Sequence, residues 1–226
     1  HHKHIKGFYS YVLVAPGRPD WKQKIEQERG SLMEAFVQTS AKSKRDHYMV
    51  SASNVPPPES DTEKTEIHEA IKILILPQFI YIDSVNQTVV PGLRQQDPNQ
   101  HHWRADNTTM YARLCDSTML SQAARRALIK RELERHLRPL GLDRDAEDSR
   151  PGGAGVFFFV SHVGGHKFLA NVLIYRKQQQ QMIWLARVRP EHCEEIVKHT
   201  ILGGNVVHPE TQLRGEFDRL RDLTGW

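Results

Sequence analysis

Two histidines on either side of a glycine pair form the pattern in this sequence that is best suited to chemistry. They occur in the run Ser161-His162-Val163-Gly164-Gly165-His166, which directly follows an apolar, strand-like segment. Glycine adopts backbone angles that other residues resist, so such a loop can bend closely enough for both imidazoles to bind one metal ion. A tight turn whose histidines hydrogen-bond to the backbone would satisfy the same pattern, and spacing alone favours that turn.

The sequence has two cysteines, Cys115 and Cys193, which are too few for a disulfide framework. Cys115 ends a short predicted strand, and Cys193 lies in the first turn of a predicted helix, where the helix dipole would lower the pKa of the thiol. We expect Cys193 to be an ordinary core or surface thiol. Because the sequence shows neither a Cys-x-x-Cys pair nor a Ser-His-Asp nucleophile context, we expect no enzyme activity.

Composition narrows the class of protein further. The 226 residues are 38% hydrophobic and carry a net charge of +4, which is typical of a globular α/β chain. The longest apolar runs, 73–77 and 156–160, are far shorter than the roughly 20 residues of a membrane span. Basic residues between Arg125 and Arg131 are interpreted as a solvated helix face, because no nucleic-acid-binding signature accompanies them.

Hydrophobic periodicity predicts an N-terminal α/β lobe over residues 1–94. A strand at 8–14 precedes a helix from Asp20 to about Gln38, in which Gln23 completes a capping-box-like start and Leu32, Met33 and Phe36 share one stripe. Further strands are predicted at 47–52, 71–76 and 79–83. The polar segment 95–110, which includes His101 and His102, is predicted to be a linker.

The second lobe, residues 111–226, repeats this order of elements. Strands are predicted at 111–115, 156–161, 168–175 and 182–188, with helices at 119–137 and 190–201. The first of these helices is expected to direct Leu120, Ala124, Ala127, Leu128 and Leu133 inward. The order of strand, helix, three strands and helix is typical of a thioredoxin-like sheet. The predicted fold class is therefore a two-lobed α/β protein with a C-terminal thioredoxin-like domain.

Longer runs of the second lobe resemble the sucrase/ferredoxin-like family of thioredoxin-like [2Fe–2S] proteins, which includes the fungal "actin patch distal" and "altered inheritance of mitochondria" proteins. The resemblance is most specific in SHVGGHKFLANVLIY, residues 161–175. It is looser in the first lobe, around residues 11–14 and 20–21. Other matching runs are 132–142, 150–153, 183–191, 196–201, 212–215 and Trp226.

This resemblance implies a ligand set for the cluster. His162 and His166 would bind one iron, and two cysteines would bind the other. Cys115 stands where the first cysteine belongs, but the second is missing, and its place falls near Gln122. The resemblance also implies the histidine loop at one end of a central strand, with Cys115 ending the neighbouring strand at the same end.

Three functions remain open from the sequence. The first is a degenerate homologue with a structural or protein-binding role and no stable cluster. The second is a [2Fe–2S] electron carrier completed by Cys193, Asp116 or an external ligand, and the third is a mononuclear metal site of Cys115, His162 and His166. A zinc site of His101, His102 and Cys115 matches no standard spacing. A protein partner of unknown identity and a mitochondrial or else cytosolic location follow from the resemblance.

Overall fold

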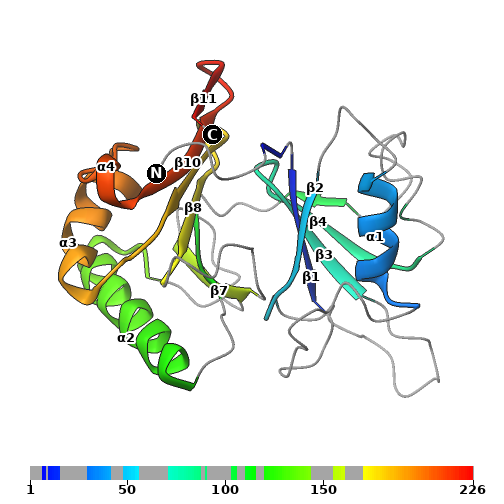
Figure 1. Ribbon diagram of the computed structural model, residues 1–226, viewed down its shortest axis with the longest axis horizontal. Coiled ribbons are helices and arrows are strands. Elements are labelled where there is room, and N and C mark those ends of the chain that lie inside the picture. The colour runs from blue at the N-terminus through cyan, green and yellow to red at the C-terminus, as the bar shows by residue number, and fades with distance from the viewer. Residues whose placement is uncertain are drawn as a thin grey trace. The chain divides into compact units, whose positions relative to one another are not determined.

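The computed structural model describes several separate segments of the chain, which are drawn as ribbons in Figure 1. For 103–105, 110–115, 120–124 and 155–158 it describes the backbone alone. The chain divides into two compact units, which we call the N-terminal unit (residues 8–106) and the C-terminal unit (residues 107–226 with 1–7). The described residues are 7–8, 10–15, 30–41, 48–55, 71–87, 90, 103–105, 110–115, 120–143, 155–160 and 170–225.

The N-terminal unit is built on a five-stranded sheet. Its elements are β1 (Ser10–Ala15), α1 (Leu32–Ala41), β2 (Tyr48–Ala52), β3 (Ile71–Leu76), β4 (Ile80–Val85) and β5 (Trp103–Ala105). The strand order is β2-β1-β3-β4-β5, in which β1 and β2 run parallel and the other neighbours run antiparallel. Buried side chains of α1, including Met33 and Phe36, pack against Val12, Val14 and Ile73 of the sheet.

The start of α1 differs from the sequence prediction. A continuous helix from Asp20 to Gln38 is wrong, because Gly30 has a left-handed backbone with φ of 74° immediately before the helix. Ser31 caps the helix, since its Oγ accepts a hydrogen bond of 3.1 Å from the backbone N–H of Glu34. The Glu34 carboxylate in turn accepts one of 2.8 Å from the N–H of Gly30. The predicted cap formed by Asp20 and Gln23 lies outside the described residues.

The segment predicted as a linker contains a strand. Within residues 95–110, β5 pairs antiparallel with β4, and Arg104 lies opposite Tyr81. The N-terminal unit ends at Asp106, so β5 belongs to it. His101 and His102 lie outside the described residues.

The C-terminal unit has a six-stranded sheet in the order β11-β10-β9-β8-β6-β7. β6 and β7 run parallel, and the other neighbours run antiparallel. The last two strands were not predicted from the sequence. The elements are β6 (Met110–Cys115), α2 (Leu120–Leu137), the 3-10 turn η3 (Arg138–Leu140), β7 (Gly155–Val160), β8 (Val172–Arg176), β9 (Gln181–Leu185), the 3-10 turn η4 (Pro190–His192), α3 (Cys193–Glu195), the π-helical η5 (Ile196–Ile201), α4 (Pro209–Gln212), β10 (Leu213–Asp218) and β11 (Leu223–Gly225).

The inward face of α2 is rotated relative to the prediction. Ile129, Leu133 and Leu137 are fully buried at helical spacing and pack with β8, β9 and the helices after β9. Leu133 was predicted to face inward, but Ala127 is exposed and Leu128 is 37% exposed. Successive helical residues are about 100° apart, so a shift of one position moves Leu128 out of the core and Ile129 into it. The side chains of residues 120–124 lie outside the described set.

The two sheets share one arrangement of strands. In each unit, the first strand has a parallel neighbour that follows it across a helix and an antiparallel neighbour that begins a hairpin. The order is β2-β1-β3-β4 in the N-terminal unit and β7-β6-β8-β9 in the C-terminal unit. Ala15 ends β1 as Cys115 ends β6. The N-terminal unit therefore has alanine at the position where the C-terminal unit has its cysteine.

The turn after η5 gives a stability prediction. Gly204 has φ of 74°, and an added Cβ would meet Nη1 of Arg176, whose guanidinium also donates to the Leu202 carbonyl at 2.9 Å. Gly141 has φ of 65° with open space around it, so it is the matched control. We expect Gly141→Ala to lower the free energy of unfolding by about 1 kcal/mol, the usual cost of a left-handed alanine. We expect Gly204→Ala to lower it further, and equal losses in urea denaturation would contradict this.

Candidate functional site

Cys115 and the end of β7 lie at the same end of the C-terminal sheet. Cys115 is the last residue of β6, and in the parallel ladder it pairs with Val160, the last residue of β7. Adjacent strands are about 4.8 Å apart, so the chain leaving β7 begins beside Cys115. This register is the geometric feature that would bring a ligand loop after β7 and the thiol of Cys115 together.

The two predicted histidine ligands lie outside the described residues. His162 stands two positions after Val160, and His166 follows in the same segment. Their role therefore stays a prediction. The strand before them differs from the expectation, because β7 is at the edge of the sheet, while β6, which carries Cys115, is flanked on both sides.

The position predicted for the missing thiolate, near Gln122, falls inside a helix. Gln122 is the third residue of α2, which begins at Leu120. Only residues 116–119 separate the start of this helix from Cys115. The backbone N–H groups in the first turn of a helix have no partner within the helix and favour negative charge nearby. A thiolate at this position would be stabilised, whereas the glutamine amide of this chain is neutral. Ser121, the alternative position for the missing ligand, precedes it in the same turn.

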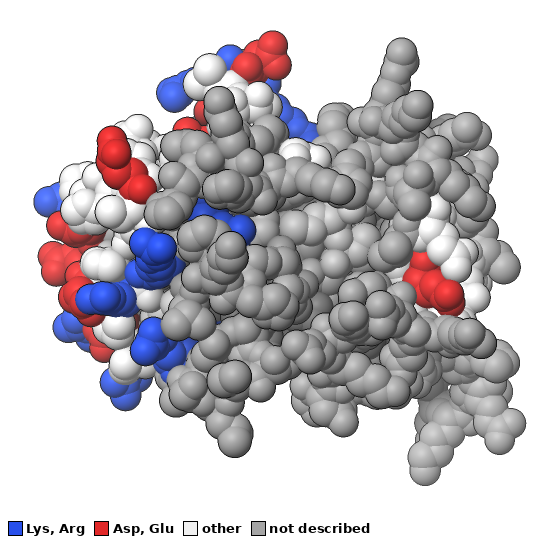
Figure 2. All heavy atoms as spheres, viewed as in Figure 1, with Lys and Arg blue, Asp and Glu red and all other residues white. Residues whose placement is uncertain are grey.

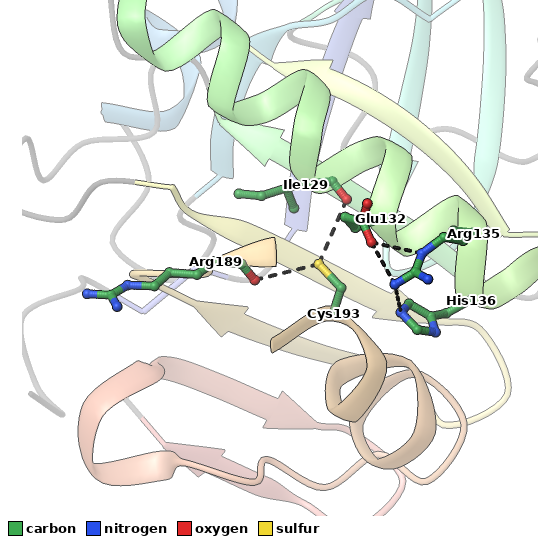
Figure 3. Close-up of polar contacts among 6 residues, drawn as sticks. All are labelled: Ile129, Glu132, Arg135, His136, Arg189 and Cys193. Carbon is green, nitrogen blue, oxygen red and sulfur yellow. Dashed lines mark hydrogen bonds and ion pairs between the residues drawn. The ribbon is translucent and has the colours of Figure 1, made fainter. Parts of the chain in front are cut away.

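The other thiol, Cys193, lies in the core, and its Sγ faces the carbonyl oxygens of Ile129 and Arg189 (Figure 3). It is the first residue of α3, its side chain has no exposed surface, and it belongs to the cluster that contains Ile129 and Leu133. Its Sγ lies 3.9 Å from the carbonyl oxygen of Ile129 and 3.7 Å from that of Arg189, so the protonated thiol donates weakly to both. Both partners accept hydrogen bonds, and neither favours a thiolate.

Burial sets the acidity of Cys193. The pKa of its thiol is raised from the ordinary 9.0 to about 12, mainly by loss of hydration and in addition by the carboxylates of Glu132 and Glu191. The positive charge of Arg135 lowers the pKa by less, and Arg135 is itself paired with Glu132 at 2.8 Å (Figure 3). The expectation of a lowered pKa is therefore wrong, because burial of the thiol disfavours its charged form.

Cys193 is also poorly placed to share a cluster with Cys115. Its Sγ contacts the carbonyl of Ile129, nine residues after the start of α2 at Leu120. At about 1.5 Å per residue, that level is roughly 13 Å along the helix from the end nearest Cys115. A metal ligand must be deprotonated, and a core thiol with a high pKa resists this. The structure therefore does not favour Cys193 as the replacement ligand.

A labelling experiment tests the state of Cys193. In a Cys115→Ala variant, Cys193 is the only cysteine, and a pKa rise of three units, from 9.0 to about 12, lowers its thiolate fraction roughly 1,000-fold near neutral pH. We expect iodoacetamide at pH 8 to modify the folded protein at least about 100-fold more slowly than the urea-unfolded protein. Comparable rates, measured by mass spectrometry, would contradict a buried, protonated thiol.

The same pKa shift predicts how stability depends on pH. A thiol whose pKa is raised by folding stabilises the fold fully below its unfolded pKa of about 9, and this contribution is lost as pH rises toward 12. The free energy of unfolding should therefore fall more steeply above pH 9 in the parent than in a Cys193→Ala variant, which has no group to titrate there.

A buried polar cluster in the C-terminal unit was not predicted from the sequence. The side-chain oxygen of Asn171 accepts hydrogen bonds of 3.0 Å from the indole N–H of Trp184 and 3.0 Å from Arg214. The Arg214 guanidinium lies 4.7 Å from the centre of the Trp184 ring, and all three residues are buried. The predicted strands at 168–175 and 182–188 contain Asn171 and Trp184, but β10, which carries Arg214, was not predicted.

The described residues give two further results. Among them, no group of three or more His, Cys, Asp or Glu side chains is arranged to hold a metal ion. His162, His166 and the side chain of Cys115 lie outside the described residues, so the predicted ligand set stays a prediction. No helix in the described part of the chain is long and apolar enough to span a membrane.

Comparison with known proteins finds one family. The family model described as sucrase/ferredoxin-like matches residues 1–215, which is nearly the whole chain. Actin patches distal protein 1 of Saccharomyces cerevisiae is 32% identical over 147 residues, covering 58% of this chain and 46% of that protein.

Two relatives share the name altered inheritance of mitochondria protein 32. The protein from Debaryomyces hansenii is 35% identical over 77 residues, covering 34% of this chain and 24% of its own length. The protein from Clavispora lusitaniae is 42% identical over 48 residues, covering 21% of this chain and 17% of its own length. The matches span less than half the length of each of these relatives.

Proposed function

Because the chain belongs to the sucrase/ferredoxin-like family, we propose that it is a thioredoxin-like ferredoxin homologue with an incomplete cluster site and a protein-binding role. The proposal includes no catalytic residue and no stable cofactor. In this proposal the chain keeps the thioredoxin-like fold implied by the family resemblance but does not hold a stable iron–sulfur cluster.

The strand order of the C-terminal unit supports the thioredoxin-like part of the proposal. A central strand, β6, has a parallel neighbour reached across α2 and an antiparallel hairpin, β8 and β9, followed by helical turns that pack on the same core as α2. These are the connections expected of a thioredoxin-like core. β10 and β11 extend the sheet beyond β9.

The main support for an incomplete cluster site is the location of Cys193, the second thiol of the chain. The chain has two cysteines, and Cys193 is buried with a pKa of about 12. One thiol, Cys115, is therefore left at the end of the sheet where β6 and β7 finish together. The family ligands that remain, one thiolate and two imidazoles, are one thiolate short of a [2Fe–2S] set, because ferric iron favours anionic thiolate and Gln122 offers only a neutral amide. In this proposal neither Asp116 nor an external ligand replaces that thiolate stably.

The names of the relatives bear on role and place. They refer to actin patches and to the inheritance of mitochondria, which are cellular processes rather than chemical reactions. We therefore propose that this chain acts through a protein partner, with a mitochondrial location, or alternatively a cytosolic one. Measurement of iron and acid-labile sulfide in the anaerobically purified chain tests the proposal, because a stable stoichiometric cluster would refute it.

A further inference from the structure

Positive charge is concentrated on one helix of the C-terminal unit. α2 carries five Lys and Arg residues against two Glu, a net charge of +3, while the whole chain carries +4. Figure 2 shows Lys and Arg gathered, with a few Asp and Glu among them, over the part of the unit that α2 occupies in Figure 1.

In two ion pairs of α2 and the turn after it, the carboxylate is largely covered and the arginine is exposed. Glu132 pairs with Arg135 at 2.8 Å, and their side chains are 19% and 67% exposed. Asp143 pairs with Arg138 at 2.9 Å, and their side chains are 19% and 73% exposed. In both pairs the guanidinium is far more exposed than the carboxylate, so these pairs present mainly positive charge to a partner.

We propose that the outward face of α2, which we call the arginine face, binds an acidic protein segment that contains apolar residues. The face consists of Arg125, Leu128, Arg131, Arg135 and Arg138, which recur at intervals of three or four residues and so lie along one side of the helix. This proposal rests on the protein-binding role proposed above and adds the chemistry of the partner.

Two features of the arginine face indicate this type of partner. Arg125 and Arg131 are exposed and form no ion pair with another described residue, so they are available to carboxylates of a partner. Leu128 is 37% exposed between them, and Leu140 just beyond the helix is 50% exposed. Arginine and lysine bind phosphate groups without help from exposed leucines, whereas protein interfaces combine arginines with apolar contacts. The exposed leucines therefore favour a protein partner.

The arginine face can be tested with a defined probe, a fluorescein-labelled peptide of Glu-Glu-Leu repeats, by anisotropy at low and high salt. We expect binding that weakens with salt. Arg131→Glu with Arg135→Glu should weaken it at least tenfold and should create binding to a Lys-Lys-Leu peptide. The matched control is Lys198→Glu with Arg221→Glu, which makes the same charge change at exposed positions outside α2 and should leave binding within about twofold.

Binding to a nucleic acid and to a membrane surface is measured separately. A single-stranded oligonucleotide and phosphatidylserine vesicles are measured with the same variants, and tighter arginine-dependent binding of either would overturn the proposal of a protein partner. Equal peptide binding by the parent and the Arg131/Arg135 variant would also overturn it. Loss of peptide binding after Leu128→Ser would support the apolar contact. Because iron content is measured independently, a failure of the arginine face is distinguishable from a failure of the incomplete-site proposal.

Discussion

Replacing Gln122 with cysteine is expected to raise the iron and acid-labile sulfide of the anaerobically purified chain from near zero toward a full [2Fe–2S] complement. Gln122 lies in the first turn of α2, close in sequence to the end of β6 at Cys115. A cysteine there would add the missing thiolate, and the unpaired N–H groups of the helix start would lower its pKa. Iron and sulfide assays with absorption spectra would measure the gain.

The controls for this prediction separate ligation from a general effect of the substitution. Gln122→Ser should gain nothing, and Gln122→Cys with Cys115→Ser should lose what the single variant gained. Ser121→Cys tests the adjacent position, which faces about 100° around the helix. If neither cysteine raises iron content while circular dichroism shows an unchanged fold, the missing ligand does not belong at this place in the chain.

Removal of the Trp184 side chain, which is among the largest fully buried side chains of the described residues, is expected to cause a large loss of stability. Trp184 is 1% exposed, donates to Asn171 at 3.0 Å and lies beneath the Arg214 guanidinium at 4.7 Å. Trp184→Ala leaves a cavity and exposes a buried guanidinium to an unfilled space. We expect the free energy of unfolding to fall by about 3–5 kcal/mol, the range for deletion of a large aromatic side chain in a core.

Two matched variants separate the contributions of Trp184. Trp184→Phe keeps an aromatic ring but removes the indole N–H, so it should cost less than the alanine variant. Leu220→Ala removes a side chain that is 68% exposed and should change stability by less than about 0.5 kcal/mol. A loss below about 1 kcal/mol for Trp184→Ala in denaturant titrations would show that the cluster contributes little.

Strands in the middle of each sheet could be predicted from the sequence because most of their residues are apolar, with one charged residue in each of β3 and β6. The predicted strand at 71–76 coincides with β3, and that at 111–115 lies within β6. β10 was missed because its charged residues made it unlike a core strand. Arg214 and Asp218 of β10 are nevertheless buried, each 5% exposed. Arg214 is covered by contacts with Trp184, a residue from another strand.

In the candidate site, too, features set by nearby residues could be predicted from the sequence, whereas features set by tertiary packing could not. Cys115 was placed correctly at a strand end by local pattern alone, since a strand's boundary depends on nearby residues. Acidity at Cys193 depends on how much of the core surrounds the thiol, which the sequence near it does not record. Local reasoning predicted a pKa lowered by the helix dipole, whereas burial against α2 raises it.

The most direct measurement for the central claim is the iron and acid-labile sulfide content of the wild-type chain, purified without oxygen and compared with His162→Ala. The incomplete site of Cys115, His162 and His166 predicts colourless protein, or colour lost quickly in air, with iron and sulfide far below one cluster per chain and little changed by His162→Ala. A stable [2Fe–2S] content of about two irons and two sulfides per chain, abolished by His162→Ala, would contradict the account.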